Sequence, residues 1–157
     1  MNFMKTLSLA MVFALSSPVW PNFIDGKWIG PATLKMEGQA PKTESCSSLE
    51  IVFSSKNDSL TVNSYKSNCP SAPSDWGPYT MPIVGNDVYS SDGESIIGSF
   101  DGIKLVTQES DGGVLYDFNA LISHQLFNKE NLEMLSEYAV TNLLGKITIE
   151  AHLKKFE

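Results

Sequence analysis

The chain has 157 residues, of which 42% are hydrophobic and 18% are charged, and it carries a formal net charge of −7 at pH 7. All eleven basic residues are lysines, so no guanidinium is present to hold a phosphate or a guanine edge in the bidentate manner of arginine. The negative net charge also repels polyanions and anionic membrane surfaces. The composition argues against nucleic-acid binding, and the length suits one domain with a full hydrophobic core.

The N-terminal segment has the pattern of a signal peptide. Lys5 precedes an apolar run over residues 6–15, which suits the core of an export signal and is too short for a transmembrane helix. Ala14 and Ser16 supply small residues at the −3 and −1 positions of a cleavage site. We expect a signal peptide at 1–17 and a single exported domain at 18–157, either periplasmic or extracellular. A buried N-terminal strand or helix is the alternative.

Turn sequences recur along the chain from residue 25 onward. Glycine adopts positive φ freely and Asp and Asn tolerate it, so such pairs favour tight hairpin turns. Their spacing indicates short antiparallel strands joined in a meander. The pairs are Asp25-Gly26, Asn57-Asp58, Asp92-Gly93, Asp101-Gly102 and Asp111-Gly112.

Calcium binding is the alternative interpretation of the same region, because acidic residues gather between positions 87 and 111. They are Asp87, Asp92, Glu94, Asp101, Glu109 and Asp111. However, no EF-hand loop and no glycine-rich calcium repeat occurs at the required offsets. We therefore expect ordinary turn chemistry and no metal site.

Alternating hydrophobicity predicts strands in the first half of the chain. Trp28, Ala32, Leu34 and Met36 share one face of the first predicted strand. In the next strand Leu49, Ile51 and Phe53 alternate with Glu50, Val52 and Ser54, and Leu60 and Val62 continue the apolar face after the Asn57-Asp58 turn.

Cys46 and Cys69, the only cysteines, lie at equal distances from the Asn57-Asp58 turn. A symmetric hairpin register pairs Phe53 with Val62 and, carried outward, brings Cys46 opposite Cys69. The spacing predicts a disulfide and therefore an oxidising compartment. Strand parity puts both cysteines on the face away from the apolar residues, at the surface. Two free thiols in a redox or metal role are the alternative, for which no Cys-x-x-Cys spacing exists.

The segment 68–82 contains four prolines, which predict a long loop rather than a central strand. Such a loop could fold over a barrel mouth as a lid, with Trp76 and Tyr79 in aromatic contact with the interior. A plain surface loop held by the disulfide is the other interpretation, and we favour it.

The second half returns to strands, at 95–100, 103–108, 114–127 and 147–155. The long strand carries one inward face, and so does the last; the two sets are Val114, Tyr116, Phe118, Ala120, Ile122, His124 and Leu126, and Ile147, Ile149, Ala151, Leu153 and Lys155. The segment 131–144 fits both a strand and a helix with Gly145 as its C-cap, and we favour a strand.

Eight to ten antiparallel strands with one apolar face each need closure to hide those faces and their edges. We expect an all-β protein, an antiparallel up-and-down meander closing into a barrel. Several predicted strands are shorter than the nine to eleven residues that cross a bilayer, and no pair of aromatic girdles is evident, which disfavours an outer-membrane barrel.

Gly26-Lys27-Trp28, at the head of the first predicted strand, resembles the Gly-x-Trp signature of lipocalin-type barrels. The resemblance implies an eight-stranded cup that holds a small apolar ligand, with the tryptophan closing the floor beneath a basic side chain from near the chain's end. Lys155 is positioned to stack on Trp28 in that role. The chain departs from the family in having no arginine and no Thr-Asp-Tyr motif; Tyr116-Asp117-Phe118 is only a faint counterpart.

Catalytic patterns are mostly absent: no Gly-x-Ser-x-Gly elbow and no metal-binding histidine spacing occurs. His152 is expected to face solvent. His124 falls on the apolar face near a strand end, where a satisfied or rim-exposed histidine is the plain alternative to a ligand contact.

We predict a monomeric, non-enzymatic barrel without a cofactor that binds a small apolar or amphipathic ligand. Its candidate lining residues are Trp28, Tyr116, Phe118 and His124. The alternative is a filled β-domain with a structural or protein-interaction role through its loops.

Overall fold

The computed structural model describes residues 23–38, 40–112, 117–140 and 145–156, so the expected signal peptide at 1–17 lies outside it. Within these ranges every regular element is a β-strand. The strands are β1 (Gly26–Glu37), β2 (Lys42–Ser55), β3 (Ser59–Ser67), β4 (Ser74–Trp76), β5 (Tyr79–Val84), β6 (Asp87–Tyr89), β7 (Ile96–Phe100), β8 (Lys104–Gly112), β9 (Asp117–Asn128), β10 (Asn131–Val140) and β11 (Gly145–Phe156).

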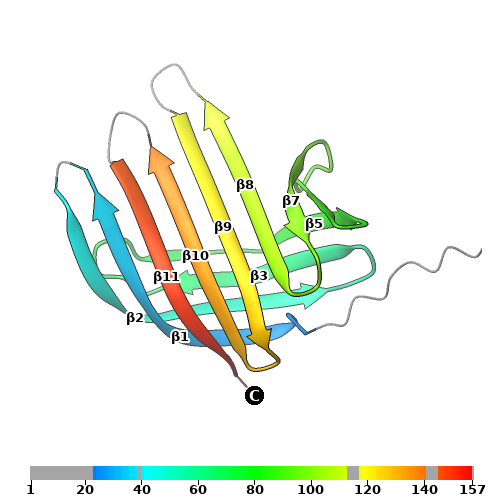
Figure 1. The fold of residues 1–157 in the computed structure, drawn as a ribbon, viewed down its shortest axis with the longest axis horizontal. Helices are drawn as coiled ribbons and strands as arrows, with labels where there is room; N and C mark the ends of the chain where they lie inside the picture. Colours follow the sequence, from blue (N-terminus) through cyan, green and yellow to red (C-terminus); the bar gives the residue numbers. More distant parts are fainter. Residues whose placement is uncertain (1–22, 39, 113–116, 141–144, 157) are drawn as a thin grey trace, which may run out of the picture.

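The strands form one closed antiparallel barrel, as predicted from the meander pattern. The sheet runs in the order β2-β1-β11-β10-β9-β8-β7-β6-β5-β3, and the pairing of β2 with β3 closes the ring; β4 adds to β3 beside β5. Figure 1 shows β8, β9, β10 and β11 side by side, with β2 and β3 crossing behind them. The ring therefore has ten strands, two more than the resemblance to lipocalin-type barrels implies.

Segment 131–140 is a strand, β10, which confirms the preferred interpretation for this part of 131–144; residues 141–144 lie outside the described ranges. The predicted inward faces of β1 and β11 are also confirmed. Ala32 and Leu34 on β1 and Ile149, Ala151 and Leu153 on β11 are all buried.

Two of the predicted turns differ in outcome. Asn57 has φ of 54° and closes the β2–β3 hairpin, whereas Asp111-Gly112 lies within β8.

The segment 68–82 is not a long loop, and our preferred prediction there was wrong. It contains β4 and the first part of β5, both of which pair with β3 in a single continuous register, Tyr65 with Trp76 and Val62 with Tyr79. The prolines are tolerated because the pairing is interrupted at Gly77-Pro78. The interruption lies beside a bulge in β3, where the register with β2 shifts between Val52 and Phe53.

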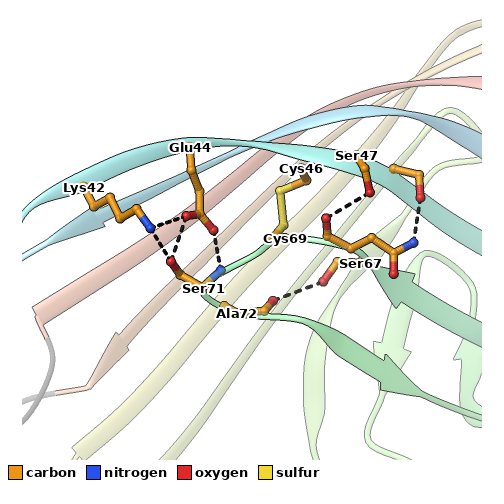
Figure 2. The surroundings of a disulfide bond; sticks show 10 residues. Lys42, Glu44, Cys46, Ser47, Ser67, Cys69, Ser71 and Ala72 are labelled. Atoms are coloured by element: carbon orange, nitrogen blue, oxygen red, sulfur yellow. Dashed lines mark hydrogen bonds and ion pairs between the residues drawn. A yellow bond between two sulfur atoms is a disulfide. The ribbon is translucent and has the colours of Figure 1, made fainter.

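Cys46 and Cys69 form the predicted disulfide, but it is not at the surface (Figure 2). Cys46 is 5% exposed and Cys69 is 1% exposed. The parity argument failed because β2 has a bulge. Three residue steps separate Leu49 from Cys46 on β2, whereas their partners on β1, Gly30 and Ala32, are two steps apart. The extra residue turns Cys46 from the outer face to the inner one.

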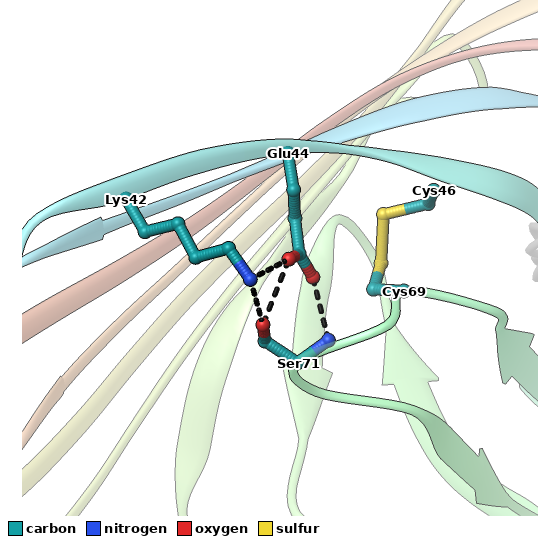
Figure 3. Close-up of polar contacts among 5 residues, drawn as sticks. All are labelled: Lys42, Glu44, Cys46, Cys69 and Ser71. Carbon is teal, nitrogen blue, oxygen red and sulfur yellow. Dashed lines mark hydrogen bonds and ion pairs between the residues drawn. A yellow bond between two sulfur atoms is a disulfide. The ribbon is translucent and has the colours of Figure 1, made fainter.

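A polar cluster holds the segment after Cys69 against β2 (Figure 3). The Glu44 carboxylate accepts hydrogen bonds from the Ser71 backbone N–H at 2.6 Å and from the Ser71 hydroxyl at 2.7 Å. The Lys42 ammonium lies 2.6 Å from the same carboxylate and donates to the Ser71 hydroxyl. The bond from Lys42, followed by the bonds from Ser71, lowers the pKa of Glu44 to about 2.

Among the described residues, no helix has the length and apolar character needed to cross a membrane.

Candidate ligand-binding cavity

One wall of the barrel interior is built in layers by β8, β9 and β10. Strand pairing places Leu105 and Met134 on either side of His124, then Thr107 and Ser136 on either side of Ile122. A third layer sets Glu109 and Tyr138 on either side of Ala120. Because alternate residues of a strand point to the same face, all three layers project inward.

The opposite wall comes from β2, β3, β4 and β5. It consists mainly of large apolar and aromatic side chains, namely Ile51, Val62, Tyr65, Trp76, Tyr79 and Met81. Tyr65 and Trp76 are stacked, with ring centroids 4.9 Å apart and planes inclined by 16°. The bulge in β3 and the interruption at Gly77-Pro78 fall side by side. Consequently Tyr65 and Val62 both face inward, and so do their strand partners Trp76 and Tyr79.

The two walls enclose a cavity of about 230 Å³. The lining residues are buried at one end of the cavity and exposed at the other. Leu105 and Ser136 have exposed fractions of 1% and 0%, whereas Trp76 is 38% exposed and Glu109 is also exposed. The cavity therefore opens to solvent near Trp76 and Glu109. At this mouth the Tyr79 hydroxyl donates to the Glu109 carboxylate at 2.8 Å, which links β5 to β8, two strands that do not pair.

Polar atoms without partners lie in the buried part of this cavity. Both ring nitrogens of His124 are buried and have no hydrogen-bond partner. The hydroxyls of Ser136 and Tyr65 are also buried; the side chain of Ser136 interacts with Tyr138, and that of Tyr65 with Ser67. His124 is 5% exposed, and its ring meets Phe53 edge-on with centroids 5.2 Å apart. Buried polar atoms are almost always hydrogen-bonded in folded proteins, so an unpaired group of this kind requires an explanation. A ligand with complementary polar atoms would supply one.

Apart from Glu109 at the mouth, the ionisable groups of the cavity are neutral near pH 7. Burial lowers the pKa of His124 to about 4, so its imidazole is uncharged and offers one donor and one acceptor. Burial also raises the pKa of Tyr65 and that of Tyr138, so both phenols stay protonated. Burial, together with the hydrogen bond to Glu109, raises the pKa of Tyr79 to about 12. Among the described lining residues, the Glu109 carboxylate is the single charge, and it lies at the mouth.

The four residues predicted to line a binding site lie in different places in the structure. His124 lines the cavity, and it is neither satisfied nor at the rim. Trp28 is fully buried outside the lining, where its indole N–H donates to the Ile24 carbonyl at 2.7 Å. Tyr116 lies outside the described residues. Phe118 is paired with Asp111 and Val140 in the next register position beyond Ala120, and its side chain lies outside the described part.

Trp28 forms the contact that the lipocalin resemblance implied. The Lys155 ammonium lies over the indole ring, 5.4 Å from its centroid. The pair closes the end of the barrel where β1 begins and β11 ends.

Sequence reasoning missed several lining residues. Ser136 was hidden because 131–144 fitted both a strand and a helix, and helical periodicity would have placed it on a different face. Glu109 was passed over because its strand was expected to end at Gln108, whereas Thr107 lies within that predicted strand, for which no inward face was assigned. Tyr65 was missed because the bulge in β3 breaks the alternation that carried Val62. Trp76 and Tyr79 were named as aromatic contacts for a lid, and both do line the cavity.

Among the described residues, no group of three or more His, Cys, Asp or Glu side chains is arranged to hold a metal ion.

Comparisons with known proteins yield similar solved structures but no matching family. No family model matches the chain, and no curated protein matches it. Among solved structures, the S-type phycobiliprotein lyase CPES from Guillardia theta is similar over 86% of this chain and 89% of its own, with 8% sequence identity and a TM-score of 0.47. The assignment of a closed antiparallel barrel therefore rests on the strand pairing described above.

Proposed function

We propose that this protein is a non-enzymatic carrier or sensor that binds a small amphipathic ligand inside its barrel. The supporting observation is the cavity of about 230 Å³ in which His124 presents two unpaired ring nitrogens amid apolar walls. Ligand sites are typically concave, mostly apolar and supplied with a few convergent polar groups. A role through the outer loops alone, the alternative function, gives no account of this cavity.

The volume limits the size of the ligand. An apolar cavity of about 150 Å³ accommodates benzene. A cavity of about 230 Å³ is therefore suited to a compact molecule of roughly two fused rings, below the 300–1,000 Å³ common for drug-sized ligands.

Calorimetric titration with naphthalene tests the binding proposal, with two neighbouring positions of β9 as a matched pair. Ala120 is 7% exposed and lines the cavity, whereas Leu121 is 37% exposed and lies outside the lining. Ala120→Phe fills the cavity and should weaken naphthalene binding at least tenfold, while Leu121→Phe should leave it unchanged. Absence of saturable binding to the parent protein, or an equal loss in both variants, would refute the proposal.

The natural ligand is a separate question. Native mass spectrometry of the mature protein from its own host would show a mass increment from any bound small molecule. Ala120→Phe expressed in the same host should lack that increment.

Export to the periplasm or the cell exterior is part of the proposal. The disulfide between Cys46 and Cys69 supports it, because such bonds persist in oxidising compartments. N-terminal sequencing of the protein from its host should find a mature start near residue 18, and a thiol assay should find no free cysteine. An intact N-terminus together with two titratable thiols would contradict export.

A further inference from the structure

The polar and charged groups of the cavity select among ligands by charge. Apart from the carboxylate of Glu109, the described lining residues carry no charge near pH 7, and no lysine is among them. An anionic ligand would lose its hydration on entering the cavity, where no cation compensates its charge. The Glu109 carboxylate at the mouth would also repel it. The ammonium group of a cationic ligand would find only neutral partners once it had passed Glu109 into the buried part of the cavity. Desolvation therefore opposes both kinds of charged ligand.

The aromatic side chains add a preference of shape. Trp76 stacks on Tyr65, and the Phe53 ring meets His124 at an interplanar angle of 85°. The rings of Trp76, Tyr65 and His124 line the cavity, and Phe53 packs behind His124 outside the lining. Aromatic side chains in the lining suit a planar aromatic ligand in offset-stacked or edge-to-face contact.

The unpaired atoms add a preference of polarity. A neutral imidazole has one N–H donor and one ring-nitrogen acceptor, and the Ser136 hydroxyl can act in either sense. A ligand hydroxyl, which both donates and accepts, can satisfy either ring nitrogen of His124 and can also pair with Ser136. A ligand without polar atoms leaves the ring nitrogens of His124 unpaired, at a cost that a hydroxylated ligand avoids.

Resting on the proposed binding function, we infer that the cavity takes a compact, neutral, planar aromatic compound bearing a hydroxyl or similar donor–acceptor group, and that His124 is the residue that recognises this group. Anionic amphiphiles such as fatty acids and aromatic carboxylates fall outside this class.

Three probes of one size test the class by titration calorimetry at pH 7: naphthalene, 1-naphthol, and 1-naphthoate, which is ionised. For the parent protein, 1-naphthol should bind about tenfold more tightly than naphthalene, as expected for one hydrogen bond to an otherwise unpaired buried group. The carboxylate 1-naphthoate should bind at least tenfold more weakly than 1-naphthol.

The two histidines provide the matched variants. His124→Phe should remove the preference for 1-naphthol, so that naphthalene and 1-naphthol bind to this variant with equal affinity. His152→Phe changes the other histidine of the chain, whose side chain is 77% exposed, and should keep the preference. If His124→Phe does not fold, Ser136→Ala serves as the second cavity variant and should reduce the same preference.

The outcomes separate the two proposals. Equal affinity for naphthalene and 1-naphthol, or tight binding of 1-naphthoate, would overturn the ligand class while leaving binding in the cavity intact. Failure of all three probes to bind would overturn both proposals. Loss of the preference in His152→Phe as well would remove His124 from the recognition role.

Discussion

The ammonium of Lys155 lies 5.4 Å from the centroid of the Trp28 ring and also donates to the Phe23 carbonyl at 3.3 Å. Trp28 is fully buried, so the lysine covers the end of the barrel with one charge held over an aromatic face. A cation over tryptophan stabilises a protein by roughly 0.5–1 kcal/mol at an accessible site.

Lys155→Met should therefore lower the free energy of unfolding by about 1 kcal/mol, because methionine retains the aliphatic contact and removes the charge. Urea denaturation measures the change. Lys154→Met is the control, since Lys154 is exposed on the outer face of the same strand and should shift the unfolding free energy by less than about 0.5 kcal/mol. Equal effects in the two variants would show that the Trp28 contact contributes nothing.

Glu44 should make the stability of the protein depend on pH in the acid range. Its pKa is lowered from 4.5 to about 2 in the folded state. Above pH 4.5 the carboxylate is ionised in both folded and unfolded chains, and its stabilising effect is fully present. Between pH 4.5 and about 2 the unfolded chain takes up a proton that the folded chain resists, so stability is lost as the pH falls.

Glu44→Gln should flatten the dependence of unfolding free energy on pH across this interval, as measured by urea unfolding at successive pH values. Asp75→Asn provides a comparison at an exposed ion pair with Lys66. A slope that is unchanged in Glu44→Gln would mean that the Lys42 and Ser71 contacts do not hold the carboxylate as described.

His124 should make the stability of the protein depend on pH in a higher range than Glu44 does. Burial lowers its pKa from 6.5 to about 4, so the imidazole is neutral in both states above pH 6.5. As the pH falls below 6.5 the unfolded chain is protonated first, and stability should fall by up to about 3 kcal/mol by the time pH 4 is passed. Tyr65, Tyr79, Tyr138 and Glu109 are the other titratable groups lining this cavity, and the three phenols stay neutral throughout the window.

The variant His124→Phe should lose this dependence and, at pH 7, should be more stable than the parent by about 1 kcal/mol, because an unpaired buried polar ring is replaced by an apolar ring of similar size. Thermal and urea unfolding at pH 7 and pH 5 would show both effects. A destabilised variant with the pH dependence intact would indicate that His124 is bonded in a way that the geometry does not show.

Gly77 should be intolerant of a side chain. A Cβ atom at this position would lie 2.5 Å from the carbonyl oxygen of Asn63, and the backbone φ is +140°. Gly77→Ala should therefore force β4 and β5 away from β3 and displace Trp76 and Tyr79 from the cavity. We expect a loss of at least about 2 kcal/mol of unfolding free energy, together with weaker naphthalene binding.

Gly85→Ala isolates the steric part of that effect. Gly85 also has a positive φ, of +63°, but an added Cβ would meet nothing within 4 Å. The Gly85→Ala variant should therefore lose only roughly 1–2 kcal/mol of unfolding free energy, which is the cost of left-handed backbone at alanine. Its affinity for naphthalene should be unchanged. If both glycine variants behaved alike, the contact with Asn63 would have no role in forming the cavity.

Regular alternation made much of the barrel predictable. The inward faces of β1 and β11, the hairpin at Asn57-Asp58 and the disulfide follow from period-two patterning and from residues near strand ends. The Lys155–Trp28 contact was implied by the resemblance to lipocalin-type barrels. What could not be foreseen depends on the bulges in β2 and β3. One extra residue in β2 turned Cys46 inward, and one in β3 brought both Val62 and Tyr65 into the interior. A bulge leaves no composition signal in these serine- and asparagine-containing stretches, so simple parity gave the wrong face beyond it.

The segment 68–82 failed for a related reason. Proline density predicts a loop when each proline is considered alone, but the interrupted strand β4–β5 places Gly77-Pro78 where β3 is already irregular. Whether such an interruption is compatible with a strand depends on its neighbour, which a single sequence does not specify.

The inward turn of Cys46 also makes the disulfide a reporter of barrel opening. With both sulfur atoms inside the packed interior, a reductant or alkylating reagent reaches them only when β2 separates from the segment that follows β3. The rate at which the bond is reduced under native conditions would thus measure how often this side of the barrel opens, and a ligand held in the cavity would slow that rate if opening were its route of escape.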